Sequence, residues 1–230
     1  MTAPKNGDDI SLTIDRDVQW FSQRVLRDAV QRADANSGTA VVMDTKSGEL
    51  LALADYPTFD PNNRLRYSKD DLGARAVSDV YEPGSVEKVL TFASLLDADK
   101  VTPTTQITVP GELPVMDRII HDYFDHGRLN LTATGVIAKS SNIGTVLAAE
   151  QFSANQLWSY LKKFGLGERT NIGLPGESRG LLPDPLAWSP LSKANISFGQ
   201  GQYKANHNME AIALEEDTTT ATITITTILQ

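Results

Sequence analysis

The sequence predicts an α/β domain, in which a sheet with flanking helices carries a helical subdomain. From Asp17 to Ala33 apolar residues recur at helical spacing, which is typical of an amphipathic helix. Apolar runs at residues 40–44 and 49–54 flank a Thr-Lys-Ser-Gly turn, which is typical of a β-hairpin. The middle of the chain then has helical segments at residues 85–96, 131–138, 143–151 and 156–164.

The remaining segments predict short strands and loops. Residues 10–14 alternate like a short strand, and Asp15 is placed to cap the helix that follows. Residues 101–128 and 173–190 are rich in Pro and Gly, so we expect loops there. Residues 218–228 are a low-complexity run of threonine and isoleucine, which predicts a single strand-like segment.

Composition and charge exclude several classes of function. The chain has 230 residues and a net charge of −8 without a basic stripe, so we expect no nucleic-acid partner. It has no cysteine, which excludes a disulfide scaffold, a thiolate metal site and a cysteine nucleophile. His121 and His126 lack an acidic partner that repeats with them, so we expect surface or loop histidines and no metal site. The chain has no apolar run of transmembrane length, and residues 1–9 lack a signal-peptide core.

The first candidate for chemistry is the pair Ser85 and Lys88. Three residues apart at the start of a helix, they share one face, where a lysine held neutral can take the serine proton. The free N–H groups at a helix N-terminus also suit a developing oxyanion. Ser159 and Lys162 have the same spacing, but they lie inside a predicted helix, so we expect a structural role for them. For Ser85 the competing interpretation is a helix N-cap.

The second candidate is Ser140-x-Asn142, on a tight turn between two predicted helices. A hydroxyl and an amide there can relay a proton and hold a peptide-like ligand, whereas the competing interpretation is an ordinary turn serine. Ser153-Ala154-Asn155 repeats the pattern, but Ser153 begins a capping box with Gln156. Lys46-Ser47-Gly48 fits a third motif in letters only, because it lies in the hairpin turn, and we expect no catalytic role for it.

Several segments in the same order resemble the transpeptidase domain of the penicillin-binding proteins. Tyr-Glu-Pro-Gly-Ser at residues 81–85 resembles the approach to that family's nucleophile, and Lys-Ser-Ser-Asn-Ile-Gly at 139–144 resembles its second motif. The closest subclass is the monofunctional, division-type class B group, with an actinobacterial source expected. The other segments that carry the resemblance are residues 40–44, 47–52, 56–62, 164–167, 174–177, 180–183, 188–190 and 197–201.

The resemblance implies the penicillin-binding-protein and serine β-lactamase-like fold, and a function. Ser85 would attack the D-Ala-D-Ala carbonyl of a peptidoglycan stem peptide, and the amine of a second stem would resolve the acyl-enzyme into a cross-link. Lys88 would be the base, Ser140 would pass the proton to the leaving amine, and Asn142 would hold the substrate amide. β-Lactam antibiotics would acylate Ser85, with no cofactor and no metal. The parent protein would act at the extracytoplasmic face of the bacterial cell membrane with division proteins as partners, its anchor lying outside this chain.

The resemblance stops at Gly201, where the family continues with a long helix, a Lys-Thr/Ser-Gly strand and two further strands. We therefore expect a start or linker segment at residues 1–9, a partial transpeptidase domain at 10–201 and an unrelated tail at 202–230. Losing an oxyanion donor costs about 10²–10³ in rate, so impaired activity is expected, with reduced stability or self-association. The alternatives are a non-catalytic fragment that binds division proteins, or a β-lactamase or D,D-carboxypeptidase of the same fold.

Overall fold

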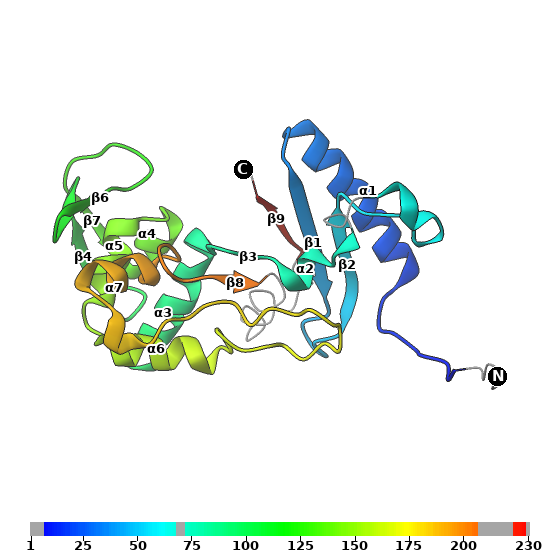
Figure 1. Cartoon of the computed structure of the whole chain (residues 1–230). Helices are drawn as coiled ribbons and strands as arrows, with labels where there is room; N and C mark the ends of the chain where they lie inside the picture. The colour runs from blue at the N-terminus through cyan, green and yellow to red at the C-terminus, as the bar shows by residue number, and fades with distance from the viewer. Residues whose placement is uncertain (1–6, 68–71, 207–222, 229–230) are drawn as a thin grey trace. The chain divides into compact units, whose positions relative to one another are not determined.

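The computed structural model describes residues 7–67, 72–206 and 223–228, which belong to two compact units (Figure 1). The first unit contains the chain up to Ala76 together with the strand at residues 223–228. The second unit begins at Val77 and contains all the remaining described residues. Among the described residues, the helices are too short or too polar to cross a membrane.

The first unit is a small antiparallel sheet with one long helix, as the sequence predicts. Asp15 caps the helix by accepting from the backbone N–H groups of Asp17 and Val18, each at 2.9 Å. The sheet order is β2-β1-β9, so the threonine-isoleucine run adds a strand to the free edge of β1. The elements are α1 (Arg16–Arg32), β1 (Ser37–Met43), β2 (Leu50–Tyr56), the 3₁₀ segment η1 (Pro61–Arg66) and β9 (Ile223–Ile228).

The outer edge of β2 is covered by the start of the chain and by α1. The side-chain amide of Gln19 donates to the carbonyl of Leu53 at 3.0 Å and accepts from its N–H at 2.7 Å. The N–H of Asp15 donates to the carbonyl of Leu51 at 2.9 Å. The strand predicted at residues 10–14 is wrong, because only isolated bonds, and no ladder, join this segment to β2. These contacts satisfy edge groups that would otherwise be free to pair with another chain.

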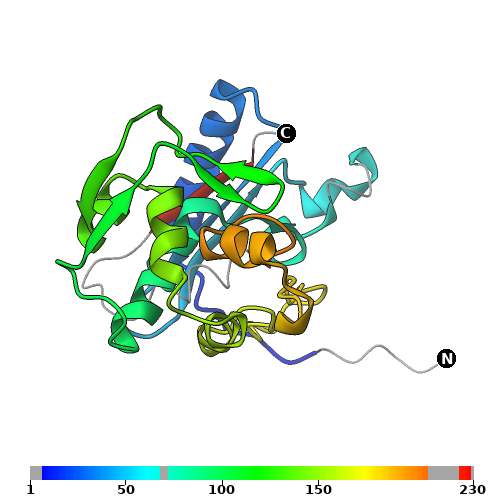
Figure 2. The same ribbon diagram turned by 90° about the vertical axis from the view of Figure 1, so that its left-hand side faces the viewer.

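The second unit is mainly helical, with three two-stranded sheets that pair β3 with β8, β4 with β7 and β5 with β6. The strands of residues 106–132, green by the colour bar, face the viewer in Figure 2. The elements are α2 (Arg75–Ser78, which spans the boundary between the units), β3 (Val80–Tyr81), η3 (Gly84–Val86), α3 (Glu87–Asp97), β4 (Gln106–Val109), β5 (Leu113–Val115), β6 (Arg118–Ile120), β7 (Leu129–Thr132), α4 (Ala133–Ala138), α5 (Asn142–Ala149), α6 (Ala154–Lys163), η4 (Pro185–Ala187), α7 (Pro190–Ser197) and β8 (Ala205–Asn206).

Residues 101–128 are loop-rich as expected, but they also contain the short strands β4, β5 and β6, which the sequence did not predict. Strands of three or four residues are too short to show an alternating pattern, and Pro and Gly between them suggested loops. The helix predicted at 131–138 begins two residues later, after β7, with the Thr132 hydroxyl accepting from the N–H of Gly135 at 3.0 Å. The helix α7 was missed, although Ser189 caps it and Pro190 opens it.

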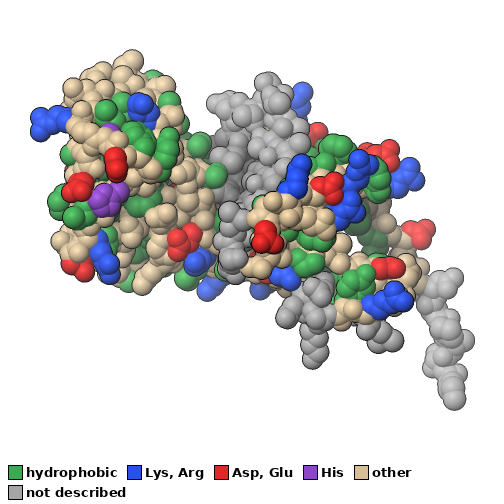
Figure 3. Space-filling model, turned by 90° about the horizontal axis from the view of Figure 1, so that it is seen from above, with side chains coloured by type: hydrophobic (Ala, Val, Ile, Leu, Met, Phe, Trp, Pro, Cys, Tyr) green, Lys and Arg blue, Asp and Glu red, His purple; other side chains and the backbone are tan. Residues whose placement is uncertain are grey.

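A continuous apolar core holds the second unit together. It joins α3, α5 and α6 through side chains that include Leu95, Ile143 and Leu161, all fully buried. Tyr203 and Ala205, which follow the Gly201 boundary, are also buried in this core. On the face shown in Figure 3, acidic and basic side chains of the described residues are interspersed, without gathering into one patch.

Candidate active site

The Ser85 turn lies at the entrance to α3 and is held by a glycine contact. Gly84 has φ +61°, in the left-handed region where a side chain is disfavoured, and its N–H donates to the carbonyl of Gly199 at 2.8 Å. Ser85 follows in the 3₁₀ turn η3 and is exposed. Among the described residues, its hydroxyl has no hydrogen-bond partner. Ser85 is therefore not the cap of α3, which begins at Glu87 with Val86 in the cap position.

The segment after α7 supports this turn from behind. Gly199 has φ +82°, and a Cβ added there would lie 2.6 Å from the nitrogen of Gly84, too close for any side chain. The hydroxyl of Thr91 donates to the carbonyl of Ser197 at 2.8 Å, which ties α3 to the same segment. Gly199, in the 197–201 motif, therefore allows the backbone to approach the Ser85 turn closely.

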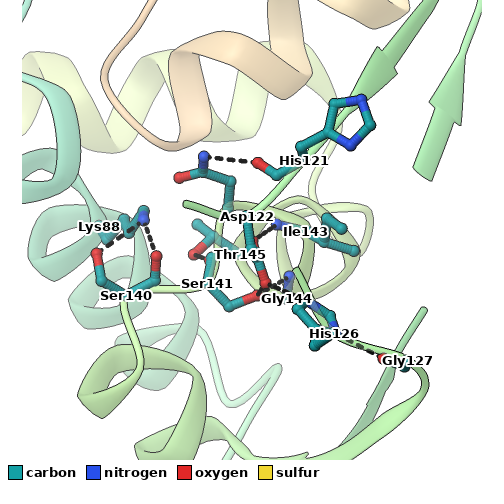
Figure 4. A network of polar contacts seen from close by, with 11 residues as sticks. Lys88, His121, Asp122, His126, Gly127, Ser140, Ser141, Ile143, Gly144 and Thr145 are labelled. Atoms are coloured by element: carbon teal, nitrogen blue, oxygen red, sulfur yellow. Dashed lines mark hydrogen bonds and ion pairs between the residues drawn. The ribbon is translucent and has the colours of Figure 1, made fainter. Parts of the chain in front are cut away.

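Lys88 lies one turn after Ser85, with only 2% of its surface exposed. Its ammonium nitrogen contacts two atoms of Ser140, the carbonyl oxygen at 2.5 Å and the hydroxyl oxygen at 3.0 Å (Figure 4). Burial lowers the pKa of Lys88 to about 8, and the carboxylate of Asp122 opposes this shift. A lysine with such a pKa holds much of its amine in the neutral form near pH 8, as a general base requires.

Ser140 occupies the turn between α4 and α5 in a strained conformation. Its φ of +51° is left-handed, a region that a serine adopts at a cost of roughly 1–2 kcal/mol. Two backbone bonds hold it there: its N–H donates to Ile137 at 2.9 Å, and the N–H of Ser141 donates to Val136 at 3.0 Å. This conformation directs both the carbonyl and the hydroxyl of Ser140 to Lys88. Strain of this kind is often found at functional sites.

Asn142 begins α5, two residues after Ser140. The nitrogen of its side-chain amide donates to the carbonyl of His121 at 3.0 Å. The oxygen of that amide has no partner among the described residues, and it can accept from the N–H of a peptide-like ligand. The structure thus brings Lys88 and Ser140 into contact, with Asn142 two residues after Ser140 and Ser85 one turn before Lys88.

A buried polar network lies behind the Ser140 turn, in the loop between β6 and β7 (Figure 4). The carboxylate of Asp122 accepts from the Ser141 hydroxyl at 2.6 Å, from the Ile143 N–H at 3.0 Å and from the ring Nε2 of His126 at 3.0 Å. The exposed side-chain fractions of Asp122 and His126 are 0% and 5%. His126 lies in a loop, which is one of the two positions expected for it, but its side chain is buried.

A second buried acid lies on α3 itself. Glu87 accepts from the hydroxyl of Tyr203 at 3.2 Å through one carboxyl oxygen, and its other oxygen has no partner among the described residues. Burial raises the pKa of Glu87 well above its usual value of 4.5. Sequence reasoning missed both this pair and Asp122, since an acid next to a motif gives no signal of its burial.

The repeated patterns have structural explanations. Ser159 is exposed on α6, and the Lys162 ammonium pairs with the carboxylate of Glu168 at 2.6 Å. Ser153 forms the predicted capping box with Gln156, so that prediction is confirmed. In the hairpin turn, Ser47 bonds only within the turn among the described residues, to Glu49 and Asp44. The described part of the chain also contains no cluster of His, Asp and Glu fit to hold a metal ion.

Comparison with known proteins places the chain in a family. Residues 38–216 match the penicillin binding protein transpeptidase domain. The chain is 39% identical over 197 residues to Penicillin-binding protein PbpB of Mycobacterium tuberculosis, and 37% identical over 194 residues to Peptidoglycan D,D-transpeptidase FtsI of Escherichia coli. These matches cover 85% and 84% of this chain but only 29% and 32% of those proteins, so the chain spans about a third of their length.

Solved structures agree with the sequence match. The crystal structure of penicillin binding protein 3 from Mycobacterium tuberculosis with ampicillin has a TM-score of 0.84 at 36% identity, over 89% of this chain and 45% of that chain. A peptidoglycan synthetase from Bifidobacterium adolescentis has a TM-score of 0.81 at 36% identity, over 91% and 38%. The chain belongs to the family of penicillin-binding protein transpeptidase domains, and both the resemblance and the fold class expected from the sequence are confirmed.

Proposed function

We propose that this chain is a serine acyl-transfer domain that acts on D-Ala-D-Ala stem peptides of peptidoglycan and is acylated by β-lactams. The observation that carries the proposal is the contact of buried Lys88 with Ser140, beside the exposed and unpartnered Ser85. In this proposal Ser85 is the nucleophile, Lys88 and Ser140 move protons, and Asn142 binds the substrate amide.

Acylation follows from the positions of these groups. The neutral amine of Lys88 takes the Ser85 hydroxyl proton as the serine oxygen attacks the carbonyl carbon. Negative charge develops on the carbonyl oxygen during the attack. The free N–H groups at the N-terminus of α3, the positive end of the helix dipole, favour this charge. When the tetrahedral intermediate collapses, the Ser140 hydroxyl passes a proton from Lys88 to the leaving D-alanine amine. A β-lactam follows the same course, but its leaving amine stays attached, so the adduct carries its whole mass.

The names of the relatives support the substrate class. FtsI of Escherichia coli is named a peptidoglycan D,D-transpeptidase, and the Mycobacterium tuberculosis structure holds ampicillin. We therefore infer a role in peptidoglycan cross-linking on the extracytoplasmic side of a bacterial membrane, with division proteins as partners of the parent protein. The only Lys-Ser/Thr-Gly in this chain is Lys46-Ser47-Gly48. We accordingly expect acylation of this chain to be slower than that of family members with the third motif by about 10²–10³.

A fluorescent penicillin tests the proposal. The wild-type chain and Ser159→Ala should both be labelled covalently after denaturing electrophoresis, whereas Ser85→Ala should remain unlabelled. Circular dichroism of each variant checks that the fold is intact. Equal labelling of Ser85→Ala would place the nucleophile elsewhere. A folded wild-type chain that takes no label would favour the non-catalytic fragment.

A further inference from the structure

We propose that Asp122 and His126 are positioning residues for acyl transfer: the pair fixes the Ser140-Ser141-Asn142 turn and sets the electrostatic field at Lys88. The inference rests on the proposed function of that turn. It assigns a role to two side chains that lie outside the motifs, in the loop between β6 and β7.

The first part of the argument is geometric. The Asp122 carboxylate bonds to the two residues on either side of Asn142, accepting from the Ser141 hydroxyl at 2.6 Å and the Ile143 N–H at 3.0 Å. The Ser141 hydroxyl also accepts from the N–H of Gly144 at 2.8 Å, as the N-cap of α5. One carboxylate thereby fixes the first turn of α5 and the peptide units that position Ser140. Figure 4 shows Asp122 between the Ser140 side and the His126 side of this network.

The second part concerns the protons of His126. Its Nδ1 lies 2.5 Å from the carbonyl oxygen of Gly127, and its Nε2 lies 3.0 Å from the Asp122 carboxylate. Both partners are acceptors, so each ring nitrogen needs a proton to make its bond. The Asp122 carboxylate also accepts from two other donors, the Ser141 hydroxyl and the Ile143 N–H. Both bonds form together only when His126 carries a proton on each ring nitrogen, so the proposal pairs an imidazolium with the Asp122 carboxylate.

The third part links this pair to Lys88. The Asp122 charge acts on Lys88, because its carboxylate raises the pKa of the ammonium against the lowering effect of burial. The other charged groups nearby are Glu87 on α3, which bonds to Tyr203, and Lys139, which lies 5.7 Å from the Phe124 ring centroid. The centroid of the Phe124 ring lies 5.0 Å from that of His126, so this ring lies near both Lys139 and His126. Loss of the negative charge of Asp122 should thus lower the proton affinity of Lys88. Loss of the positive charge of His126 should raise it.

The test compares Asp122→Asn and His126→Gln, with Asp125→Asn as the matched control. Asp125 is an exposed acid in the same loop, and it has none of these contacts. The measurement is the rate of acylation by a fluorescent penicillin between pH 6 and pH 10. In the wild-type chain the rate should rise with pH, pass half of its maximum near pH 8 as Lys88 loses its proton, and level off about one pH unit higher.

Opposite shifts of this pH profile are expected. Asp122→Asn removes the negative charge, so the rising limb of its plot of acylation rate against pH should move to lower pH by roughly half a unit or more. At a pH on this limb, the shift alone raises the rate about threefold. His126→Gln leaves Asp122 without its counter-ion, and its limb should move to higher pH. Asp125→Asn should match the wild-type chain. A uniform loss of rate in both variants, with the limb unmoved, would reduce the pair to a structural role and overturn the proposal.

A second measurement does not depend on acylation. Nitrogen-15 spectra of the histidine side chains, assigned with His126→Gln, report the protons on each ring. Two ring protons on His126 at pH 7 are expected, and one in Asp122→Asn, where the amide nitrogen of the new side chain can donate to Nε2. A single ring proton in the wild-type chain would overturn the inference. A wild-type chain that shows two protons but takes no penicillin would keep the ion pair and reject the proposed function instead.

Discussion

The two Ser-x-x-Lys sequences of this chain have opposite environments. At Ser85 the serine is exposed in a 3₁₀ turn, and Lys88 is buried against Ser140 with a pKa lowered to about 8. At Ser159 the serine is exposed inside α6, and Lys162 forms a partly exposed ion pair with Glu168. The spacing is the same in both places. What differs is the burial of the amine and, among the residues that the structure describes, the absence of a counter-ion in direct contact with it. These two features decide which pair can do acid–base chemistry.

The largest difference is expected from replacing the two lysines. Lys88→Met should lower the rate of acylation by about 10²–10⁴, the contribution that general-base catalysis typically makes. Lys162→Met should leave that rate within about twofold, because its ammonium neutralises only Glu168. The measurement is the time course of labelling by a fluorescent penicillin at pH 8. Similar losses in the two variants would break the distinction between the sites.

The next effect concerns the turn that presents Ser85. Gly199→Ala forces a side chain against Gly84, so the turn must shift, and acylation should fall by about 10². Gly173→Ala is the matched control, since Gly173 has a similar φ of +84° but nothing within 4 Å of the added Cβ. Both variants carry the same backbone strain, and only the first displaces the turn. If both acylate at the same rate, the close approach of Gly199 has no catalytic importance.

A smaller effect separates the conformation of Ser140 from its hydroxyl. Ser140→Gly removes the hydroxyl and also relieves the left-handed strain. We therefore expect the free energy of unfolding to rise by about 1 kcal/mol. Ser140→Ala removes the hydroxyl and keeps the strain. Acylation should slow by a factor of about 10–10² in both. Denaturant unfolding and labelling rates measure the two effects, and normal acylation in either variant would exclude a proton relay through Ser140.

The smallest effect is the gain of stability that we expect at high pH when Glu87 is replaced. Its folded-state pKa is raised, so the unfolded chain releases its proton first, and stability falls as pH rises above about 4.5. Glu87→Gln should therefore melt a few degrees higher than the wild-type chain at pH 8, since each kcal/mol raises the melting temperature by about 2–4 °C. At pH 4.5 the two chains should melt at the same temperature. Glu112→Gln, an exposed acid of the same unit, should not change the melting temperature. A lower melting temperature for Glu87→Gln at pH 8 would mean that the carboxylate is ionised and stabilising.

Strong local patterns made the larger elements predictable. The periodicity of α1, the cap at Asp15 and the β1–β2 hairpin follow from side chains close together in sequence. The candidate residues Ser85, Lys88, Ser140 and Asn142 were predicted from their motifs, and the structure brings Lys88 and Ser140 into contact. Their catalytic roles remain predictions.

Other features depend on contacts distant in sequence, and the sequence alone gave no sign of them. Tyr203 bonds to Glu87 across 116 positions, and it lies beyond Gly201, where the family-like sequence was expected to stop. That boundary stays a prediction, although the match to the family continues to residue 216. Asp122 and His126 were similarly hidden, because only the folded loop buries them. Of the tail, β9 pairs with β1, and residues 207–222 lie outside the described residues.

The most direct test of the central claim is to locate the penicillin adduct in the wild-type chain. Trypsin separates the two candidates, since cleavage after Arg75 and Lys88 gives residues 76–88, and cleavage after Lys139 and Lys162 gives residues 140–162. Tandem mass spectrometry then distinguishes Ser85 from Ser78 within the first peptide. The account predicts one adduct with the whole mass of the penicillin, on Ser85. An adduct on any serine of residues 140–162, with Ser85 unmodified, would contradict it.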